Sequence, residues 1–382
     1  MLVEHRHGPD GQRRSARRRR AVVTFAVCAA CLCGAVLVPS ASAAATWSVA
    51  DPPFTVPWGV SVPFAPLYGI SAVSTSDVWA VGEVSGTPLT ENWSGSKWSS
   101  VALPAGPCSA FESDCVLTGV SGDSPGDVIA VGDGIINSES SAGWVATPLA
   151  FHYNGDAWAA MTLPSALPYT ALQHVAAFSP TDAWAVGIGN STTATTALAL
   201  QWNGSTWTQV PTPISTTNDL TINAISGSSA SDIWVVGQTV TPGYHNRQFT
   251  SVIMHYNGSS WTQSSVPDQS GLLDVDALSP VDAWAVAADG SVLNWNGSAW
   301  TVQTQESGAQ QVAVLSPSDV WVGGIVSVGH YNGSAWSTTP TPSGINELYG
   351  AAVLSPGRAW FAGISYKSNG DEVPAVLSTS NG

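Results

Sequence analysis

The sequence has little charge. Only 10% of its 382 residues are Asp, Glu, Lys or Arg, and the 11 basic residues face 26 acidic ones. Soluble domains usually contain about a quarter charged residues. A chain this poor in Lys, Glu and Leu cannot form many amphipathic surface helices, which excludes helix bundles and coiled coils. The formal net charge of −15 argues against a nucleic-acid partner, because a phosphate backbone is bound by basic surfaces.

Most of the basic residues lie at the N-terminus. Six arginines fall between Arg13 and Arg20, followed by an apolar run over residues 21–38 and the small residues Ala-Ser-Ala at 41–43. This order is typical of a cleaved secretory signal peptide, and we expect residues 1–43 to be one. An uncleaved membrane anchor, a twin-arginine export signal and lipidation of a leader cysteine are the alternatives.

The remaining chain, residues 44–382, is predicted to be a single secreted domain with no membrane association after cleavage. It keeps four basic residues against 24 acidic ones, a formal charge of −20. Its two cysteines, Cys108 and Cys115, lie close together in a Pro/Gly/Ser-rich stretch. In an oxidising compartment they are predicted to form a disulfide that staples a loop, in preference to a metal site.

Internal repetition is the strongest pattern in this domain. A first half-unit, S-x-x-D-x-W-A-V-G, begins at Ser74, Ser124, Ser179, Ser229, Ser279, Ser316 and Ser355. A second half-unit, N-G-x-x-W-[ST], ends at Trp98 (with Ser-Gly in place of Asn-Gly), Trp158, Trp207, Trp261, Trp300 and Trp336. A unit of about 48 residues with this content predicts four antiparallel strands, as in a propeller blade.

The third unit illustrates the expected strands. They cover residues 173–178, 183–187 and 198–202, and the fourth begins at Trp207. Strand alternation places Trp184 and Val186 on one face of the sheet and Ala183 and Ala185 on the other. The Asn-Gly pair between the last two strands predicts a two-residue hairpin.

The missing second half-unit lies at the other end of the domain. The seventh unit stops at Asn381-Gly382, and residues 44–53 resemble the strands that begin at Trp207 and Trp336. We infer that Trp47-Ser48-Val49 returns to complete the last blade, which only a closed ring requires. The predicted fold is therefore an all-β, seven-bladed β-propeller of four-stranded antiparallel blades, with the last blade closed by the N-terminal strand.

Repeated residues are expected to be structural. The 18 tryptophans recur mainly in the second and fourth strands, where burial explains them better than sugar binding does. The aspartates that recur before the second strand are interpreted as turn caps. His152, His255 and His330 share one position in alternate blades, too far apart for a common metal site. No metal site or cofactor is predicted, and no Ser-His-Asp, P-loop or zinc motif is present.

The D-x-W-A-V-G and Y-N-G-S-x-W units resemble repeats of secreted, actinobacterial-type propeller proteins. They are similar, more distantly, to kelch repeats and the central domain of galactose oxidase. The resemblance implies the fold and no activity. A double Gly occurs only at Gly323-Gly324, so the kelch signature is not met. The arginine triad of sialidases is absent, and so is the Tyr–Cys pair of copper radical oxidases.

Loop lengths indicate where a site lies. The turns between the first and second strands and between the third and fourth strands are uniform, whereas the connections at the opposite end vary, and variable loops on a rigid scaffold usually carry function. The candidate binding residues are Tyr244, His245, Asn246 and Arg247 in the fourth unit, Trp144 in the second, and Trp58 before the first. The alternative is that these residues pack against a neighbouring blade.

We therefore expect a secreted, monomeric recognition propeller that binds an extracellular protein or glycan through its variable loops. The alternative is an extracellular polysaccharide hydrolase or lyase, with carboxylates such as Glu83, Asp133 and Asp289 meeting over the central channel. Nothing in the spacing of these acids pairs them.

Overall fold

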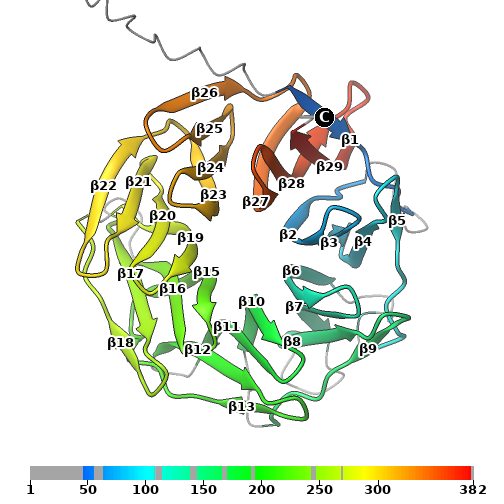
Figure 1. Cartoon of the computed structure of the whole chain (residues 1–382). Helices are drawn as coiled ribbons and strands as arrows, with labels where there is room; N and C mark the ends of the chain where they lie inside the picture. The colour runs from blue at the N-terminus through cyan, green and yellow to red at the C-terminus, as the bar shows by residue number, and fades with distance from the viewer. Residues whose placement is uncertain are drawn as a thin grey trace, which may run out of the picture. The chain divides into compact units, whose positions relative to one another are not determined.

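Seven sheets are arranged as the blades of a ring in the computed structural model (Figure 1), each built on four antiparallel strands. The structure describes residues 46–55, 63–106, 108, 114–137, 144–165, 170–190, 194–241, 247–267 and 270–379. They belong to one compact unit, residues 44–382. The signal peptide predicted for residues 1–43 lies outside the described residues. In the part of the chain that is described, no helix is long and apolar enough to cross a membrane.

Each blade runs from an innermost to an outermost strand in chain order, except that the outermost strand of the last blade is the N-terminal β1. The first three blades comprise β2 (Leu67–Ser74), β3 (Asp77–Val84), β4 (Thr87–Trp93) and β5 (Trp98–Ser100); β6 (Asp114–Ser124), β7 (Asp127–Asn137), β8 (Trp144–Tyr153) and β9 (Trp158–Ala160); and β10 (Thr170–Ser179), β11 (Asp182–Asn190), β12 (Thr195–Trp202) and β13 (Trp207–Gln209). The short β14 (Ser215–Thr216) also pairs with β12, an addition that the sequence did not predict.

The remaining blades follow the same order. They comprise β15 (Asp219–Ser229), β16 (Asp232–Val240), β17 (Phe249–Tyr256) and β18 (Trp261–Gln263); β19 (Leu272–Ser279), β20 (Asp282–Ala287), β21 (Ser291–Trp295) and β22 (Trp300–Gln305); β23 (Ala309–Ser316), β24 (Asp319–Gly324), β25 (Ser327–Tyr331) and β26 (Trp336–Pro340); and β27 (Ile345–Ser355), β28 (Arg358–Tyr366), β29 (Glu372–Thr379) and β1 (Trp47–Ala50).

The last blade is closed by the N-terminal strand, as predicted. β1 pairs antiparallel with β29, with Trp47 opposite Thr379 and Ala50 opposite Val376. Figure 1 shows this strand beside the C-terminal one, the two ends of the colour scale meeting in one sheet. The hydrogen bonds of this pair join the two ends of the domain, so the ring has no open edge between its first and last blades.

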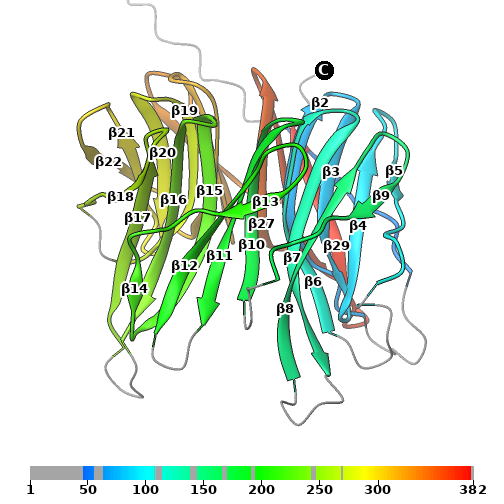
Figure 2. The same cartoon turned by 90° about the horizontal axis from the view of Figure 1, so that it is seen from below.

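The first-to-second and third-to-fourth turns of every blade lie at one end of the ring, which we call the turn face. The other connections lie at the opposite end, the loop face, which is the lower end in Figure 2. On the turn face, the first Ser of the S-x-x-D segment caps its turn at Ser74, Ser179, Ser229, Ser279 and Ser316. The Thr181 N–H, for example, donates to the Ser179 hydroxyl over 3.3 Å.

The Asn-Gly turns differ from the predicted two-residue hairpins. Trp202 pairs with Trp207, so four residues form the loop, and the Asn203 Oδ1 accepts the backbone N–H groups of Ser205 and Thr206 at 3.0 and 2.9 Å. Gly204 has a φ of +89°, but Ser85 is the only non-glycine with positive φ among the described residues. A two-residue type I′ turn needs positive φ at both central positions, and Asn203 does not supply it.

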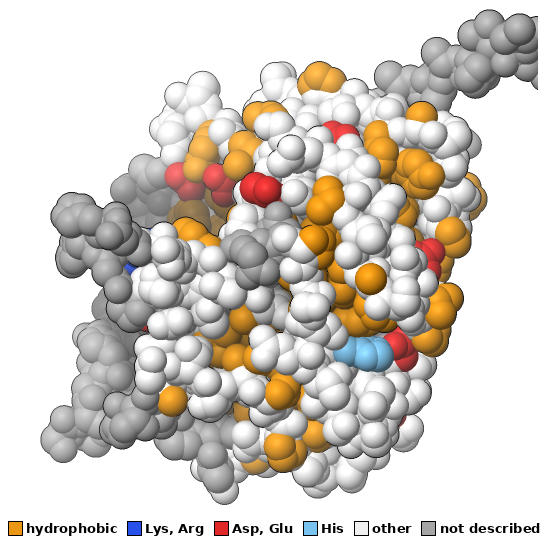
Figure 3. Space-filling model, turned by 90° about the vertical axis from the view of Figure 1, so that its left-hand side faces the viewer, with side chains coloured by type: hydrophobic (Ala, Val, Ile, Leu, Met, Phe, Trp, Pro, Cys, Tyr) orange, Lys and Arg blue, Asp and Glu red, His pale blue; other side chains and the backbone are white. Residues whose placement is uncertain are grey.

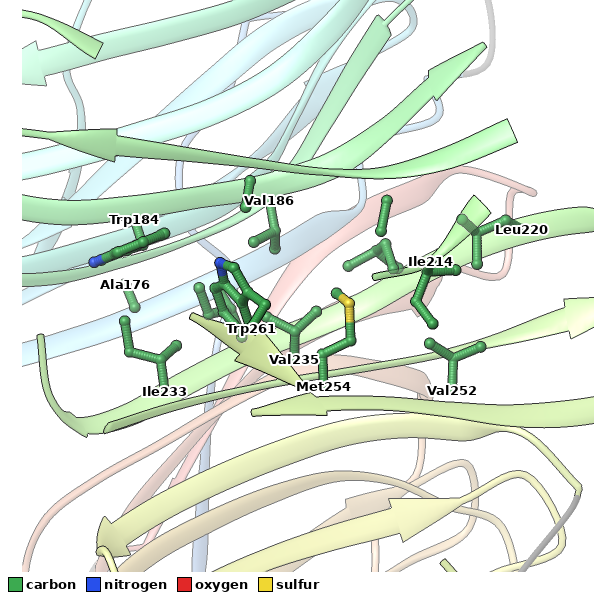
Figure 4. Packing of buried hydrophobic residues seen from close by; sticks show 14 residues of the cluster. Ala176, Trp184, Val186, Ile214, Leu220, Ile233, Val235, Val252, Met254 and Trp261 are labelled. Atoms are coloured by element: carbon green, nitrogen blue, oxygen red, sulfur yellow. The ribbon is translucent and has the colours of Figure 1, made fainter. Parts of the chain in front are cut away.

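The hydrophobic core consists of layers between neighbouring blades. Figure 4 shows the layer between the third and fourth blades, where Trp184 and Val186 meet Ile233, Val235 and Trp261. Ala183 and Ala185 belong to the layer on the other side, as the strand alternation predicted. Large side chains on one face of a sheet and small ones on the other let twisted blades pack closely.

Tryptophan pairs connect the blades. The second-strand Trp of one blade lies edge-on to the first Trp of the outer strand in the next blade, as in Trp184–Trp261 (5.5 Å, 82°) and Trp234–Trp300 (5.2 Å, 87°). The same pairing joins Trp79 to Trp158, Trp284 to Trp336, Trp321 to Trp47 and Trp360 to Trp98. The prediction that repeated Trp residues form the core is confirmed.

Candidate functional site

Two of the candidate residues on the loop face lie in the described part of the chain. Arg247 is exposed just before β17, and Trp144 begins β8 opposite Asn137. Tyr244, His245, Asn246 and Trp58 lie outside the described residues, so the predicted binding surface stays a prediction. Cys108 and Cys115 form a disulfide, with Cα atoms 5.8 Å apart, in the connection that leads into β6. This linkage anchors one loop of the loop face.

Exposed hydrophobic side chains concentrate on the loop face. In the described part of the chain, eight large hydrophobic side chains are exposed, and five of them lie at this end of the blades: Phe64, Phe249, Ile325, Val326 and Tyr366. The other three, Val49, Val281 and Val302, lie on an outer strand or on the turn face. The loop face therefore carries most of the exposed large hydrophobic side chains among the described residues.

A central channel of about 420 Å³ runs between the seven innermost strands. Toward the loop face it continues into a hollow of about 330 Å³, whose lining includes Thr118, Gln173, Asn223 and Gln310. His174 and Gln311 line both spaces. A volume of this size is typical of a pocket for a small ligand or a large side chain.

One level of the channel is strongly asymmetric. The second strand of each blade contains the Gly (or Ala) that ends the W-A-V-G motif, and the residue before it pairs with one residue of the innermost strand. These seven innermost-strand residues are Gly69, Gly119, His174, Ala224, Asp274, Gln311 and Gly350. At the glycines the neighbouring backbones are in contact: a Cβ on Gly119 would lie 2.8 Å from the Cα of His174. One side of this level is therefore bare backbone, and the other carries His174, Asp274 and Gln311.

Side chains next to the channel also hold neighbouring blades together. Ser71, Ser121 and Ser226 each accept a backbone N–H from the next blade, at 3.0–3.2 Å. Asp276 occupies the same position in the fifth blade and accepts the Val314 N–H at 2.7 Å and the Ser226 hydroxyl at 2.8 Å. These contacts join the innermost strands of neighbouring blades around the channel.

Burial changes the protonation of two channel residues. Asp274 accepts N–H groups from Val275 and Val312 at 2.9 and 2.8 Å. Burial nevertheless raises the pKa of its carboxyl to about 8, and the neighbouring Asp276 charge adds to the increase. Burial lowers the pKa of His174 to about 4, so its imidazole is neutral at pH 7.

Three carboxylates interact near the loop face, between the first and second blades. Burial raises the pKa of Glu83, and the charges of Asp114 and Asp133 add to this effect. Burial and the Asp114 charge likewise raise the pKa of Asp133. Of the three acids singled out from the sequence, Asp133 therefore contributes to the raised pKa of Glu83. Asp289 instead caps the tight turn of the fifth blade by accepting the Ser291 N–H at 2.8 Å.

The recurring aspartates have a different role from the predicted one. Their carboxylates reach across to the third strand, where Asp232 accepts from the His255 Nε2 at 2.7 Å and Asp319 from the His330 Nε2 at 2.9 Å. Asp282 binds the Asn294 amide at 2.7 Å in the same way. The interpretation as turn caps is wrong, because the first Ser of the motif already caps the turn. Within the described ranges, no group of three or more His, Cys, Asp and Glu is arranged to hold a metal ion.

Sequence reasoning missed the channel residues. A signal for them exists in the repeats: the innermost strands read Gly-Ile-Ser-Ala at 69–72 and Gly-Val-Ser-Gly at 119–122, but His, Asp and Gln replace the Gly at 174, 274 and 311. Departures from a repeat, more than the repeat itself, mark the unusual side chains.

Comparisons with known proteins support the fold and leave the ligand open. No protein-family model and no curated protein sequence matches the chain. A structure described as YCF48 bound to D1 peptide is similar with a TM-score of 0.58, at 14% identity, over 88% of this chain and 97% of that one. YCF48 from Cyanidioschyzon merolae gives a TM-score of 0.57 at 17% identity over 88% and 99%. The WD40 propeller domain of Doa1 gives 0.53 at 12% identity over 86% and 98%. The chain is a seven-bladed β-propeller.

Proposed function

We propose that this chain is a secreted, non-catalytic recognition propeller that binds an extracellular protein through its loop face. The observation that carries the proposal is the distribution of exposed apolar side chains, of which Phe64, Phe249, Ile325, Val326 and Tyr366 share that face. Apolar groups exposed together on one face of a soluble protein are typical of a binding surface.

The fold neighbours favour a protein partner over a glycan. One of the solved propellers with a similar fold is described as bound to a peptide, and propellers commonly present their loops to protein segments. The kelch and galactose-oxidase resemblance, the actinobacterial type of the repeats and the monomeric state belong to the same proposal. The resemblance and the type of the repeats rest on the repeat motifs.

Charge favours a basic partner. Residues 44–382 contain 24 acidic residues and only four basic ones. One of the two basic side chains on the described loop face, Lys367, is already paired with Asp51 at 2.6 Å. Figure 3 shows one side of the ring, with β18 and β22, on which most side chains are uncharged and acidic ones lie toward both ends. Such a surface attracts cationic segments over several ångströms.

The partner class is tested by presenting the protein to a random peptide library and to a glycan array in parallel. The proposal predicts enrichment of peptides that combine Lys or Arg with apolar residues, and no glycan hits. Glycan binding without peptide enrichment would contradict it. Secretion is tested by sequencing the N-terminus of protein recovered from the culture medium, which we expect to begin at Ala44; an intact Met1 on membrane-associated protein would support the anchor instead.

A polysaccharide hydrolase or lyase is the second candidate, because burial and nearby acidic charges raise the pKa values of both Glu83 and Asp133 near the loop face. Paired acids with raised pKa values are found in glycoside hydrolases. A screen for polysaccharide cleavage, repeated with Glu83→Gln and Asp133→Asn, separates the two functions. Cleavage that both variants abolish would favour the enzyme.

A further inference from the structure

We propose that the central channel receives a cationic side chain, the ammonium of a Lys or the guanidinium of an Arg, from the partner bound at the loop face. The group would sit at the level of His174, Asp274 and Gln311. This inference rests on the proposed function, since the hollow beside His174 and Gln311 opens toward the loop face.

The channel has bare backbone on one side and polar groups on the other. Glycines at 69, 119 and 350 bring neighbouring blades into close contact at this level, where a Cβ on Gly350 would lie 3.1 Å from the Ile70 nitrogen. The opposite blades contribute His174, Asp274 and Gln311 at the same register position. A long side chain that entered from the loop face would meet these polar groups directly.

Asp274 and Asp276 offer more hydrogen-bond acceptors than the contacts between blades use. Asp276 makes the inter-blade contact that Ser71, Ser121 and Ser226 make with a hydroxyl alone. Asp274 and Asp276 line the channel together, and the lining contains no Lys or Arg. When ionised, the Asp274 carboxylate offers about four acceptor positions, and its hydrogen bonds use two of them. A bound cation would favour this ionised form. Acceptors therefore remain for a cation.

One acceptor beside the channel is buried without a partner. This is the Gln173 Oε1, which belongs to the hollow that His174 and Gln311 also line. A buried acceptor left unpaired is costly. An ammonium carries three N–H donors and no acceptor, so it complements a ring of carboxylate, amide and neutral imidazole groups. The carboxyl groups of Asp274 and Asp276, with no Lys or Arg in the lining, favour a cation over an anion at this level.

The experiment uses two blocked pentapeptides, acetyl-Gly-Gly-Lys-Gly-Gly-amide and its Gln counterpart, titrated into protein with ¹³C-labelled histidine. The Lys peptide is expected to shift the His174 imidazole resonance, assigned with His174→Gln, and to bind about tenfold more tightly than the Gln peptide, a difference of about 1.4 kcal/mol. Equal binding of the two peptides, or binding that leaves the His174 signal in place, would overturn the inference.

Variants locate the cation. Asp274→Asn should remove the preference for Lys, whereas Asp156→Asn, an exposed acid on the turn face, removes the same charge and should keep it. If Asp274→Asn does not fold, Gln311→Lys tests the same site. It places an ammonium beside Asp274 and should raise the melting temperature while abolishing peptide binding. A Gln311→Lys protein that binds the Lys peptide normally would contradict the site.

The inference and the proposed function fail separately. If library peptides bind the loop face but tolerate replacement of every Lys and Arg by Gln, the recognition function stands and the channel site does not. If the Lys pentapeptide binds the channel and the library yields no peptides, the loop-face proposal is the one that fails.

Discussion

Trp47 packs edge-to-face against Trp321, with ring centroids 6.0 Å apart and planes at 82°. The first residue of the N-terminal strand thus occupies the position that Trp158, Trp261 and Trp300 occupy in other blades, each against the second-strand Trp of the preceding blade. It also lies 6.0 Å from the ring of Phe361. Closure of the ring therefore combines strand pairing with the same aromatic contact that joins the other blades.

Trp47→Ala should lower stability sharply. The substitution removes an aromatic contact and opens the layer between the sixth and seventh blades, for an expected loss of about 3 kcal/mol. Ser48→Ala, in the same strand with an exposed side chain, should change little. Deletion of residues 44–52 should lower stability more than either substitution. Thermal unfolding followed by circular dichroism measures all three, and a deletion that melts like the wild type would refute closure by β1.

In the Asp–His pairs on the turn face, replacement of the His by Asn should be tolerated, and replacement by an apolar residue should lower stability. The first and fifth blades already use Asn at this position, with the Asn92 amide 2.6 Å from Asp77. We expect His255→Asn to be nearly neutral. His255→Leu should cost about 1–3 kcal/mol, because the buried Asp232 carboxylate loses a donor. Urea unfolding of the two variants measures the difference, and equal losses would show that packing of the ring, not the hydrogen bond, matters.

Glu91 should make stability depend on pH. This carboxyl is fully buried on β4, and burial raises its pKa to about 7. The Ser100 hydroxyl lies 2.5 Å from the Glu91 Oε1 and 3.0 Å from the Pro53 carbonyl oxygen. When Glu91 is protonated, it can donate to the Ser100 hydroxyl while that hydroxyl donates to the Pro53 carbonyl. Because the pKa of Glu91 in the folded protein lies above the ordinary 4.5, its protonated carboxyl stabilises the fold fully below pH 4.5. This stabilisation is lost as the pH rises through 7.

Glu91→Gln should flatten this profile. The amide can donate to Ser100 at every pH, so the variant should match the wild type near pH 5 and exceed its stability by about 3 kcal/mol at pH 9, at 1.36 kcal/mol per pH unit. Unfolding free energies at pH 5, 7 and 9 provide the comparison, with Asp156→Asn as the exposed control. Parallel profiles for Glu91→Gln and the wild type would place the titrating group elsewhere.

The repeats predicted most of the fold because each strand is specified locally. The third-unit strands expected at 183–187 and 198–202 lie within β11 and β12, and the half-unit missing at Asn381-Gly382 led to β1 as the closing strand. The Asn-Gly turns were assigned the wrong length, because the Asn side chain caps a longer loop instead of adopting a left-handed backbone.

The candidate site was less predictable. His174, Asp274 and Gln311 are separated by many residues, and only the ring brings them to one level of the channel. Their chemistry is visible only as a departure from the Gly of other blades. The loop around Tyr244 is unusual by composition alone, and composition does not show which side chains face a ligand.

Recognition through the loop face is tested most directly by comparing two double variants against the same random peptide library. Phe64→Ser with Tyr366→Ser removes apolar surface from the loop face, and Val281→Ser with Val302→Ser removes exposed apolar side chains elsewhere. The account predicts at least a tenfold loss of affinity for selected peptides in the first protein and unchanged affinity in the second. Equal affinity in both proteins, or a loss confined to the second, would contradict it.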